Sequence, residues 1–193
     1  MGNKKFGFRN YHPIRNPNKV NDSFNFFISN DDSVIYKQNN HSDQTFSKLL
    51  KNQENYDAFE KILNGTLFTL SMAKHVCKGF DLESDGSYKM KFLQGYRLDL
   101  LESYNFDTSL AKSISDQCEI LLESLTETNQ EGKFFGDWAT HNLVYSSELN
   151  MILNIDLEGF LTYKPVPEWA DFSVVEGWIN EVIAQLQSII SEN

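Results

Sequence analysis

The chain has 193 residues, of which 40% are hydrophobic, and a formal charge of −10 at neutral pH. A chain of this length can bury a core of its own, and its acidic balance argues against general nucleic-acid binding because polyanions are repelled. No stretch is long and apolar enough to span a membrane, and the two cysteines show neither metal-site spacing nor a secretory context. These features predict a cytoplasmic protein with reduced thiols.

The first part of the chain contains three segments with the composition of β-strands. Residues 6–9, 23–28 and 33–37 are rich in aromatic or β-branched residues and are separated by polar, turn-forming residues. Residues 12–19, between the first two segments, contain two prolines and no glycine. We therefore expect the chain to begin with an antiparallel sheet.

A helix and a second hairpin are predicted next. Residues 44–63 carry apolar side chains at an approximately helical spacing, and Gly65 is suited to end the helix. Strands are predicted at residues 76–82 and 87–93, because the segment between them has the composition of a hairpin turn. Residues 94–97 then lead into the second half of the chain.

The second half combines helices with a short hairpin. Apolar residues at helical spacing predict one long helix through residues 110–125 and another through residues 175–190. Between them, strands are predicted at residues 133–135, 143–145 and 151–155. The polar residues that separate the last two strands predict that these pair as a hairpin.

The strongest functional signal surrounds this hairpin. Asp137 lies five positions before Asn142, and Asp156 follows fourteen positions after it, so the hairpin would bring Asn142 and Asp156 to the same end of the sheet. Phosphoryl transfer uses a carboxylate that orients the acceptor hydroxyl and takes up its proton, together with oxygen ligands for Mg²⁺. Asp137 suits the first role, and Asn142 and Asp156 suit the second.

These motifs resemble those of the protein kinase-like superfamily, in particular its aminoglycoside and choline phosphotransferase branch. The family's catalytic loop reads His-Gly-Asp-x-x-x-x-Asn, which residues 136–142 match, and its metal loop is similar to residues 155–158, Ile-Asp-Leu-Glu. The resemblance implies an α+β, two-lobed kinase-like fold. A small antiparallel-sheet lobe would occupy residues 1–94 and a reduced, mostly helical lobe residues 95–193, with ATP and Mg²⁺ as cofactors.

The resemblance also assigns residues of the first lobe to the nucleotide phosphates. Lys37, at the end of a predicted strand, would bind the α- and β-phosphates and pair with Glu60, for which Glu54 is the alternative. A lysine at the end of an exposed edge strand can instead be a solubilising charge. Arg15 would supply a cation where kinases use glycine amides, or else the turn around it is a solvent loop stiffened by proline.

The base of the nucleotide is expected to contact the main chain. Lys91, Phe92 and Leu93 precede a segment, residues 94–97, that resembles the linker between kinase lobes, so their backbone groups would line the base pocket. Trp138, inside the catalytic loop, would either pack against the acceptor or belong to the core.

The sequence departs from the family pattern at informative positions. Phe135 replaces the histidine of the catalytic loop, Ala139 replaces the lysine of protein kinases, and the C-terminal region is short. These differences favour phosphate transfer from ATP to a hydroxyl of a small molecule or glycan. The alternatives are a pseudokinase that binds nucleotide or a partner without turnover, and a purely structural interaction domain. Apolar helix faces left exposed by the reduced lobe would allow a homodimer.

Overall fold

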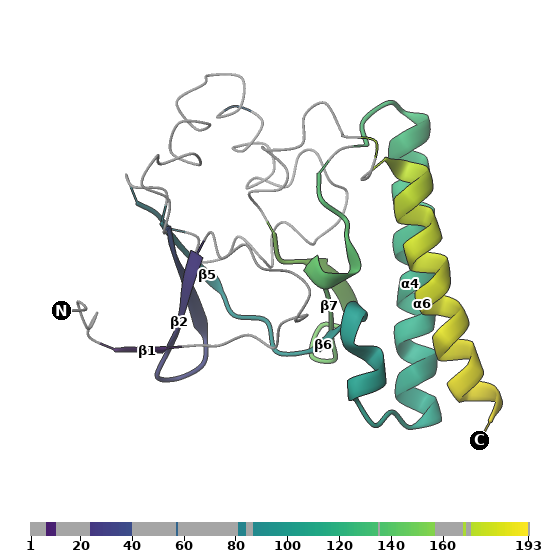
Figure 1. The fold of residues 1–193 in the computed structure, drawn as a ribbon, viewed down its shortest axis with the longest axis horizontal. Coiled ribbons are helices and arrows are strands. Elements are labelled where there is room, and N and C mark those ends of the chain that lie inside the picture. Colours follow the sequence, from purple (N-terminus) through teal and green to yellow (C-terminus); the bar gives the residue numbers. More distant parts are fainter. Residues whose placement is uncertain are drawn as a thin grey trace. The chain divides into compact units, whose positions relative to one another are not determined.

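The computed structural model describes residues 7–10, 24–39, 57, 81–83, 87–134, 136–156, 168 and 171–192. The chain divides into two compact units, Met1–Leu93 and Gln94–Asn193. Within the described ranges, the first unit contains an antiparallel sheet, and the second contains a smaller sheet and two long helices (Figure 1).

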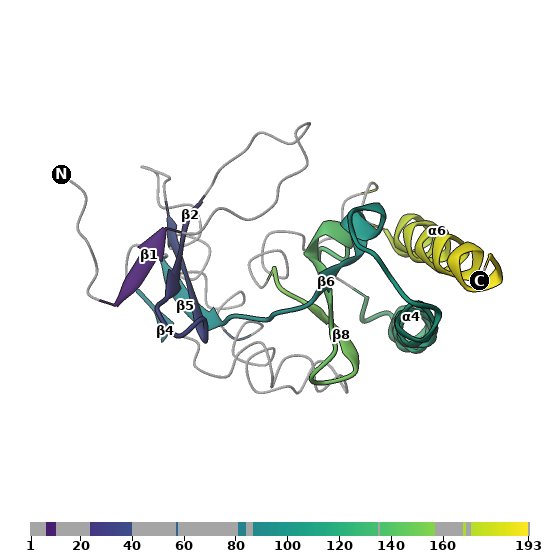
Figure 2. The same ribbon diagram turned by 90° about the horizontal axis from the view of Figure 1, so that it is seen from below.

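The first unit is built on a sheet of five described strands, all antiparallel to their neighbours (Figure 2). The strands are β1 (Phe8–Asn10), β2 (Phe24–Ser29), β3 (Val34–Asn39), β4 (Asp81–Leu82) and β5 (Tyr88–Lys91). Their order is β1-β2-β3-β5-β4, so β3 lies in the middle of the sheet, between β2 and β5.

Apolar side chains cover both faces of this sheet. On one face, the ring of Tyr36 contacts the rings of Phe8 and Phe27, with centroid separations of 6.2 and 6.0 Å. On the other face, Tyr88 and Met90 of β5 are buried. Because successive side chains of a strand point to opposite faces, burial on both faces accounts for the aromatic-rich strand composition.

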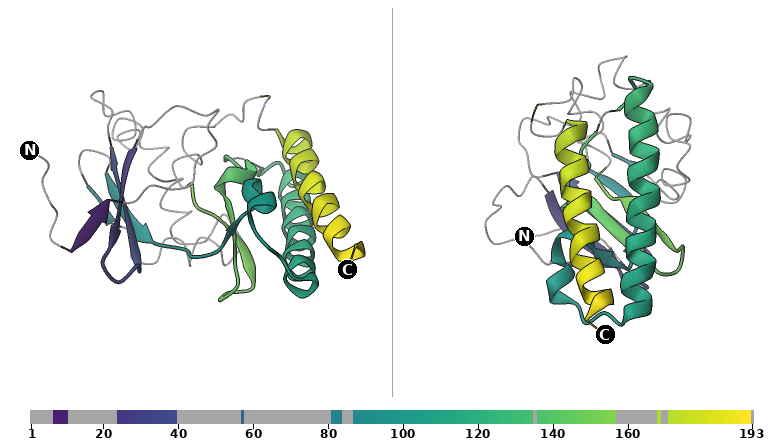
Figure 3. Two further views of the ribbon diagram at one scale, coloured as in Figure 1. Left: turned by 60° about the horizontal axis from the view of Figure 1, so that its bottom comes forward. Right: turned by 90° about the vertical axis from the view of Figure 1, so that its right-hand side faces the viewer.

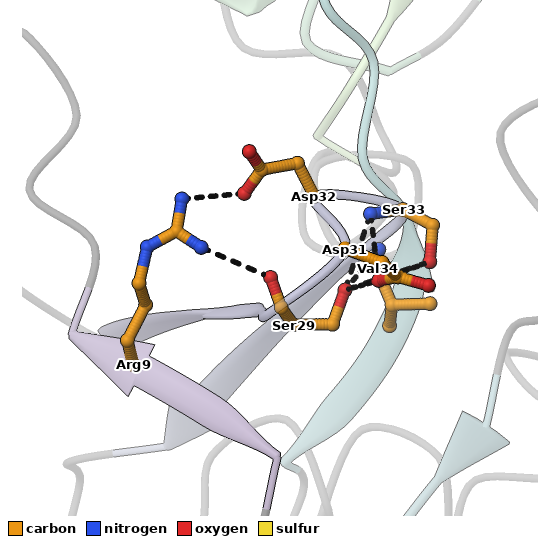
Figure 4. A network of polar contacts seen from close by, with 6 residues as sticks. All are labelled: Arg9, Ser29, Asp31, Asp32, Ser33 and Val34. Carbon is orange, nitrogen blue, oxygen red and sulfur yellow. Dashed lines mark hydrogen bonds and ion pairs between the residues drawn. The ribbon is translucent and has the colours of Figure 1, made fainter.

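A network of polar contacts holds the turn between β2 and β3 (Figure 4). One carboxylate oxygen of Asp31 accepts hydrogen bonds from Ser29 Oγ at 2.6 Å and from Ser33 Oγ at 2.8 Å. These hydrogen bonds, that of Ser29 first, lower the pKa of Asp31 to about 2. The adjacent Asp32, which has a φ of 57°, forms an ion pair with Arg9 of β1. The turn is thereby tied to the edge of the sheet.

The second unit contains an antiparallel sheet of three described strands. In spatial order they are β6 (Tyr96–Arg97), β7 (Leu143–Ser146) and β8 (Met151–Asn154). The hairpin predicted for β7 and β8 is confirmed. In the segment predicted as a linker, residues 94–97, Tyr96 pairs with Tyr145 in this sheet. A Cβ atom at Gly95 would lie 2.1 Å from the main-chain oxygen of Tyr145, so only glycine fits there.

Two long helices pack against each other in the described part of this unit (Figure 3). The helices are α4 (Thr108–Gln130) and α6 (Phe172–Ser191), together with the 3-10 helices η1 (Leu98–Ser103) and η2 (Thr140–Asn142). Each long helix begins at an aspartate cap: Asp107 accepts a hydrogen bond from Leu110 N at 2.7 Å, and Asp171 accepts one from Val174 N at 3.0 Å. The helices run antiparallel, and α4 also contacts β8.

The contact between α4 and α6 forms a large part of the core of this unit. Buried positions recur every three or four residues along both helices, as the sequence periodicity predicts. These positions are Ala111, Ile114, Ser115, Cys118, Leu121 and Leu125 on α4, and Val175, Ile179, Val182, Ile183 and Leu186 on α6. Burial raises the pKa of the Cys118 thiol to about 12, so this free thiol stays protonated and is a poor nucleophile.

The prediction of a strand at residues 133–135 is wrong for its described part. Gly132, with a φ of 67°, ends helix α4, and Lys133 N donates to Thr128 O at 2.9 Å in the pattern that closes many helices. Phe134 follows as irregular chain, and its ring contacts that of Phe172 edge-on, with centroids 5.6 Å apart. Phe134 thus packs against Phe172 of α6 instead of pairing in a sheet.

The coarse fold class predicted from the sequence is confirmed: the described residues form antiparallel sheets and two packed long helices. Apart from Asp57, the predicted helix at residues 44–63 lies outside the described residues, as do the turn at residues 12–19 and residues 76–80 of a predicted strand. In the ranges that are described, no helix combines the length and apolar character needed to cross a membrane.

Candidate functional site

The hairpin of β7 and β8 brings two predicted site residues together. Leu143 pairs with Asn154, and beyond this last pair the N–H of Ile155 donates to the main-chain oxygen of Asn142 at 2.8 Å. Asp156 is the next residue. The main chain at Asn142 therefore lies beside the main chain at Asp156, as the hairpin predicts, despite the fourteen positions between them in the sequence.

Asp137 lies in a tight loop that precedes the hairpin. Gly136 has a φ of 101°, a conformation that residues with a side chain rarely adopt, which explains the glycine before the aspartate. The Oδ1 of Asp137 accepts a hydrogen bond from Ala139 N at 3.0 Å, as in turns initiated by aspartate. Its Oδ2 forms no hydrogen bond with a described residue, and the side chain is 6% exposed. One oxygen thus fixes the loop, and the other remains available for chemistry.

Asn154 connects this loop to the segment that carries Asp156, and sequence reasoning missed it. Its Nδ2 donates to the main-chain oxygen of Asp137 at 2.6 Å, and its Oδ1 accepts from Asp156 N at 2.9 Å. The only signal in the sequence is a polar residue within the otherwise apolar run Met151–Ile155. A polar side chain on a buried strand is expected to form hydrogen bonds with other buried groups.

Asn142 is buried in the 3-10 helix η2, directly before β7. Its side chain is 8% exposed, and its Nδ2 is buried without a hydrogen-bond partner among the described residues. An unpaired buried amide group costs stability, so its presence asks for an explanation. The amide oxygen of Asn142 and the carboxylate of Asp156 are both hard donors of the kind that Mg²⁺ prefers. The residues present therefore fit a Mg²⁺ ion.

Trp138 belongs to the core. Its side chain is 0% exposed, so the ring is not available to line an acceptor site. Of the two roles that the sequence leaves open for this residue, packing is the one that its burial supports.

In the first unit, Lys37 is buried on the central strand β3. Its side chain is 8% exposed, and its Nζ lies 5.2 Å from the ring centroid of Tyr88, its paired residue on β5. The distance is that of a cation–π contact. Because β3 has a described neighbour on each side, Lys37 is not the solubilising charge of an edge strand. Lysine is rarely buried without a specific interaction, and the contact with the Tyr88 ring is one such interaction of Lys37.

The main chain at residues 91–93 is partly occupied by the sheet. Lys91 is the last residue of β5 and pairs with Val34, and Phe92 N donates to Ser33 O at 2.9 Å. The N–H of Phe92 is used in this way, so a contact between Phe92 and a base would use its main-chain oxygen. For Lys91 and Leu93, main-chain contact with a nucleotide base stays a prediction.

The remaining predicted site residues lie outside the described residues. These are Arg15, Glu60 and its alternative Glu54, together with Phe135 of the catalytic loop. Their predicted roles are therefore untested.

In comparisons with known proteins, the sequence matches no protein-family model and no curated protein. The interpretation of the site thus depends on its residues, on their geometry and on the motif resemblance.

Proposed function

We propose that the chain is an ATP-dependent phosphotransferase of the kinase-like type, which moves the γ-phosphate of ATP to a hydroxyl of a small molecule or glycan. The observation that carries the proposal is the arrangement around the β7–β8 hairpin in the second unit. There Asn142 directly precedes β7 and Asp156 comes shortly after β8, at the same end of the sheet. Asn154 links the Asp137 loop to this end.

Asp137 is the proposed general base. Its Oδ1 is held by Ala139 N, so the carboxylate has a fixed orientation, and its Oδ2 can accept a hydrogen bond from an acceptor hydroxyl. A carboxylate in this role orients the hydroxyl and takes up its proton as the bond to phosphorus forms. The low exposure of the side chain favours an acceptor that excludes water when it binds.

Asn142 and Asp156 are the proposed Mg²⁺ ligands, through the amide oxygen and the carboxylate. Bound Mg²⁺ would neutralise charge on the phosphate oxygens of the nucleotide. Two protein ligands are sufficient for Mg²⁺, which usually keeps several waters and phosphate oxygens in its coordination shell. The hairpin supports this assignment, because it holds the main chain at Asn142 beside the segment that carries Asp156.

Lys37 is the proposed phosphate-binding lysine of the first unit. The motif resemblance supports this role, together with the position of Lys37 on the central strand β3, where its Nζ contacts the ring of Tyr88. Its predicted pairing with Glu60 stays a prediction.

The decisive experiment measures ATP consumption by the purified protein with Mg²⁺ and fractionated metabolites and glycans. Asp137→Asn, which keeps the shape of the side chain, should reduce acceptor-dependent consumption at least 10²-fold because it removes the base. Asp116→Asn, the same substitution at an exposed position of α4, is the matched control and should retain activity. Consumption that is equal in the Asp137→Asn variant and the wild type would contradict the assignment.

A second candidate function is that of a pseudokinase, which binds nucleotide or a partner without turnover. The burial of Asp137, at 6% exposure, favours it, because a closed loop can bind nucleotide and still exclude an acceptor. Nucleotide binding without consumption of ATP in any fraction would support this alternative.

A further inference from the structure

Asn154 is chemically suited to its contacts with Asp137 and Asp156, and no other residue type of its size is. A carboxylate has no hydrogen to donate to the main-chain oxygen of Asp137, and an aliphatic side chain can neither donate nor accept. Serine and threonine are shorter and have one hydroxyl, whereas glutamine adds a methylene group to a closely packed interior. The carboxamide of asparagine donates to Asp137 and accepts from Asp156 at the same time.

The position of Asn154 makes these contacts strong. The side chain is 2% exposed, and its neighbours in the strand are apolar. In an interior of low dielectric constant, a satisfied hydrogen bond is stronger than in water, and an unsatisfied polar group is costly. Asparagine is also a poor strand former. Its presence on β8 is therefore explained by what it connects, and not by the stability of the strand.

We propose that Asn154 is a positioning residue, which holds the main chain at Asp137 against the main chain at Asp156 so that base and metal ligand keep one relative position. The inference rests on the proposed phosphotransferase function and adds a residue to the same site. Misplacing a reacting group by about 1 Å can lower a rate about 10²-fold. Removing a residue that supports a metal ligand commonly lowers metal affinity or activity about 10–100-fold.

Two variants separate the two contacts. Asn154→Leu has a similar shape and removes both contacts, whereas Asn154→Asp keeps an acceptor for Asp156 N and loses the donor to Asp137. In both, at saturating Mg²⁺, kcat should fall about 10–100-fold with the KM for ATP nearly unchanged, because Asn154 does not contact the nucleotide itself. Ser146→Ala is the matched control: this serine is equally buried, at 2% exposure, and lies at the other end of the same hairpin. Its kcat should equal that of the wild type.

Amide hydrogen exchange gives a readout that needs no turnover. The Asp156 amide should exchange about 10-fold faster or more in Asn154→Leu, where its acceptor is lost, and as slowly as in the wild type in Asn154→Asp. The affinity for Mg²⁺ alone, measured by calorimetry, should fall about 10–100-fold in Asn154→Leu. Ser146→Ala should change neither quantity.

The possible results distinguish a failure of this inference from a failure of the proposed function. An inactive wild-type protein would remove the proposed function, and exchange and Mg²⁺ affinity would then decide the role of Asn154. Unchanged Asp156 exchange in Asn154→Leu, or full kcat in both Asn154 variants of an active enzyme, would overturn the inference. If Asn154→Leu does not fold, Asn154→Asp decides, through its kcat or through faster exchange of the Ala139 amide, which depends on the Asp137 loop.

Discussion

The residues of the candidate site differ in how well their place in the site can be predicted from their neighbours in the sequence. Asp137 and Asn142 are recognisable because each belongs to a local motif, and the positive φ of Gly136 explains why glycine precedes the aspartate. Asn154 is not recognisable in this way, because its partners are identified only once the loop and the hairpin are folded. Trp138 shows the same limit, since its burial depends on elements distant in the sequence.

A pH titration can test the hydrogen bonds of a single residue, Asp31. Hydrogen bonds from Ser29 and Ser33 lower its pKa from 3.8 to about 2, so the turn between β2 and β3 is stabilised by the ionised form. The contribution of ionised Asp31 to the stability of the folded state is complete above the unfolded pKa of about 3.9 and is lost as the pH falls through about 2. An NMR titration of the Asp31 carboxyl should give a midpoint near 2. Ser29→Ala should raise it, and a wild-type midpoint near 3.8 would contradict the network.

At the scale of elements, local patterns predicted most of what is described. The periodicity of α4 and α6 and the turn composition of the β7–β8 hairpin depend on neighbouring residues, so the sequence is sufficient to find them. The strand predicted at residues 133–135 was wrong, and strand β6 was not predicted, because both depend on longer-range contacts. β6 has only two residues and is defined by its pairing with β7, and residues 133 and 134 follow a helix end that directs them toward α6.

Helix α4 has an electrostatic property that the periodicity does not reveal. Glu119, Glu123 and Glu127 follow one another at intervals of four residues, and together with Glu176 of α6 they line a shallow groove. Among the described residues that line it, none is a lysine or arginine. Like charges four residues apart on a helix repel each other by about 0.2–0.5 kcal/mol per pair.

Glu123→Lys should therefore stabilise the protein. The substitution removes two repulsive pairs and creates two attractive ones, so we expect a gain of about 0.8–2 kcal/mol at low salt in urea unfolding, and less at 1 M NaCl. Glu148→Lys makes the same change in net charge at an exposed position of the hairpin turn and is the control. An equal gain in both variants would mean that net charge, and not the spacing on α4, is responsible.

At the scale of the whole molecule, binding of the proposed nucleotide should stabilise the folded state. A ligand at about 100 times its Kd stabilises the folded state by about 2.7 kcal/mol, and each kcal/mol raises the Tm of a chain of this size by about 2–4 °C. ATP with Mg²⁺ should therefore raise the Tm by about 5–10 °C under these conditions.

The part of the Tm shift that ATP causes and the part that Mg²⁺ adds can be assigned to different residues. Lys37→Ala should reduce the shift caused by ATP, and Asp156→Asn should remove the additional shift caused by Mg²⁺. The exposed Asp116→Asn variant is the control. If ATP and Mg²⁺ leave the Tm unchanged at millimolar concentrations, neither the phosphotransferase nor the nucleotide-binding pseudokinase describes this chain.

The hairpin also determines how distant relatives of this chain would differ in length. Residues 143–146 and 151–154 are paired, and inserting one residue in either strand would turn the following side chains to the opposite face of the sheet. The turn at residues 147–150 has no such constraint, because it lies at the other end from Asn142 and Asp156. Insertions and deletions should therefore gather in this turn, and an alignment that penalises gaps lightly there and heavily in the strands is the one best suited to reveal relatives.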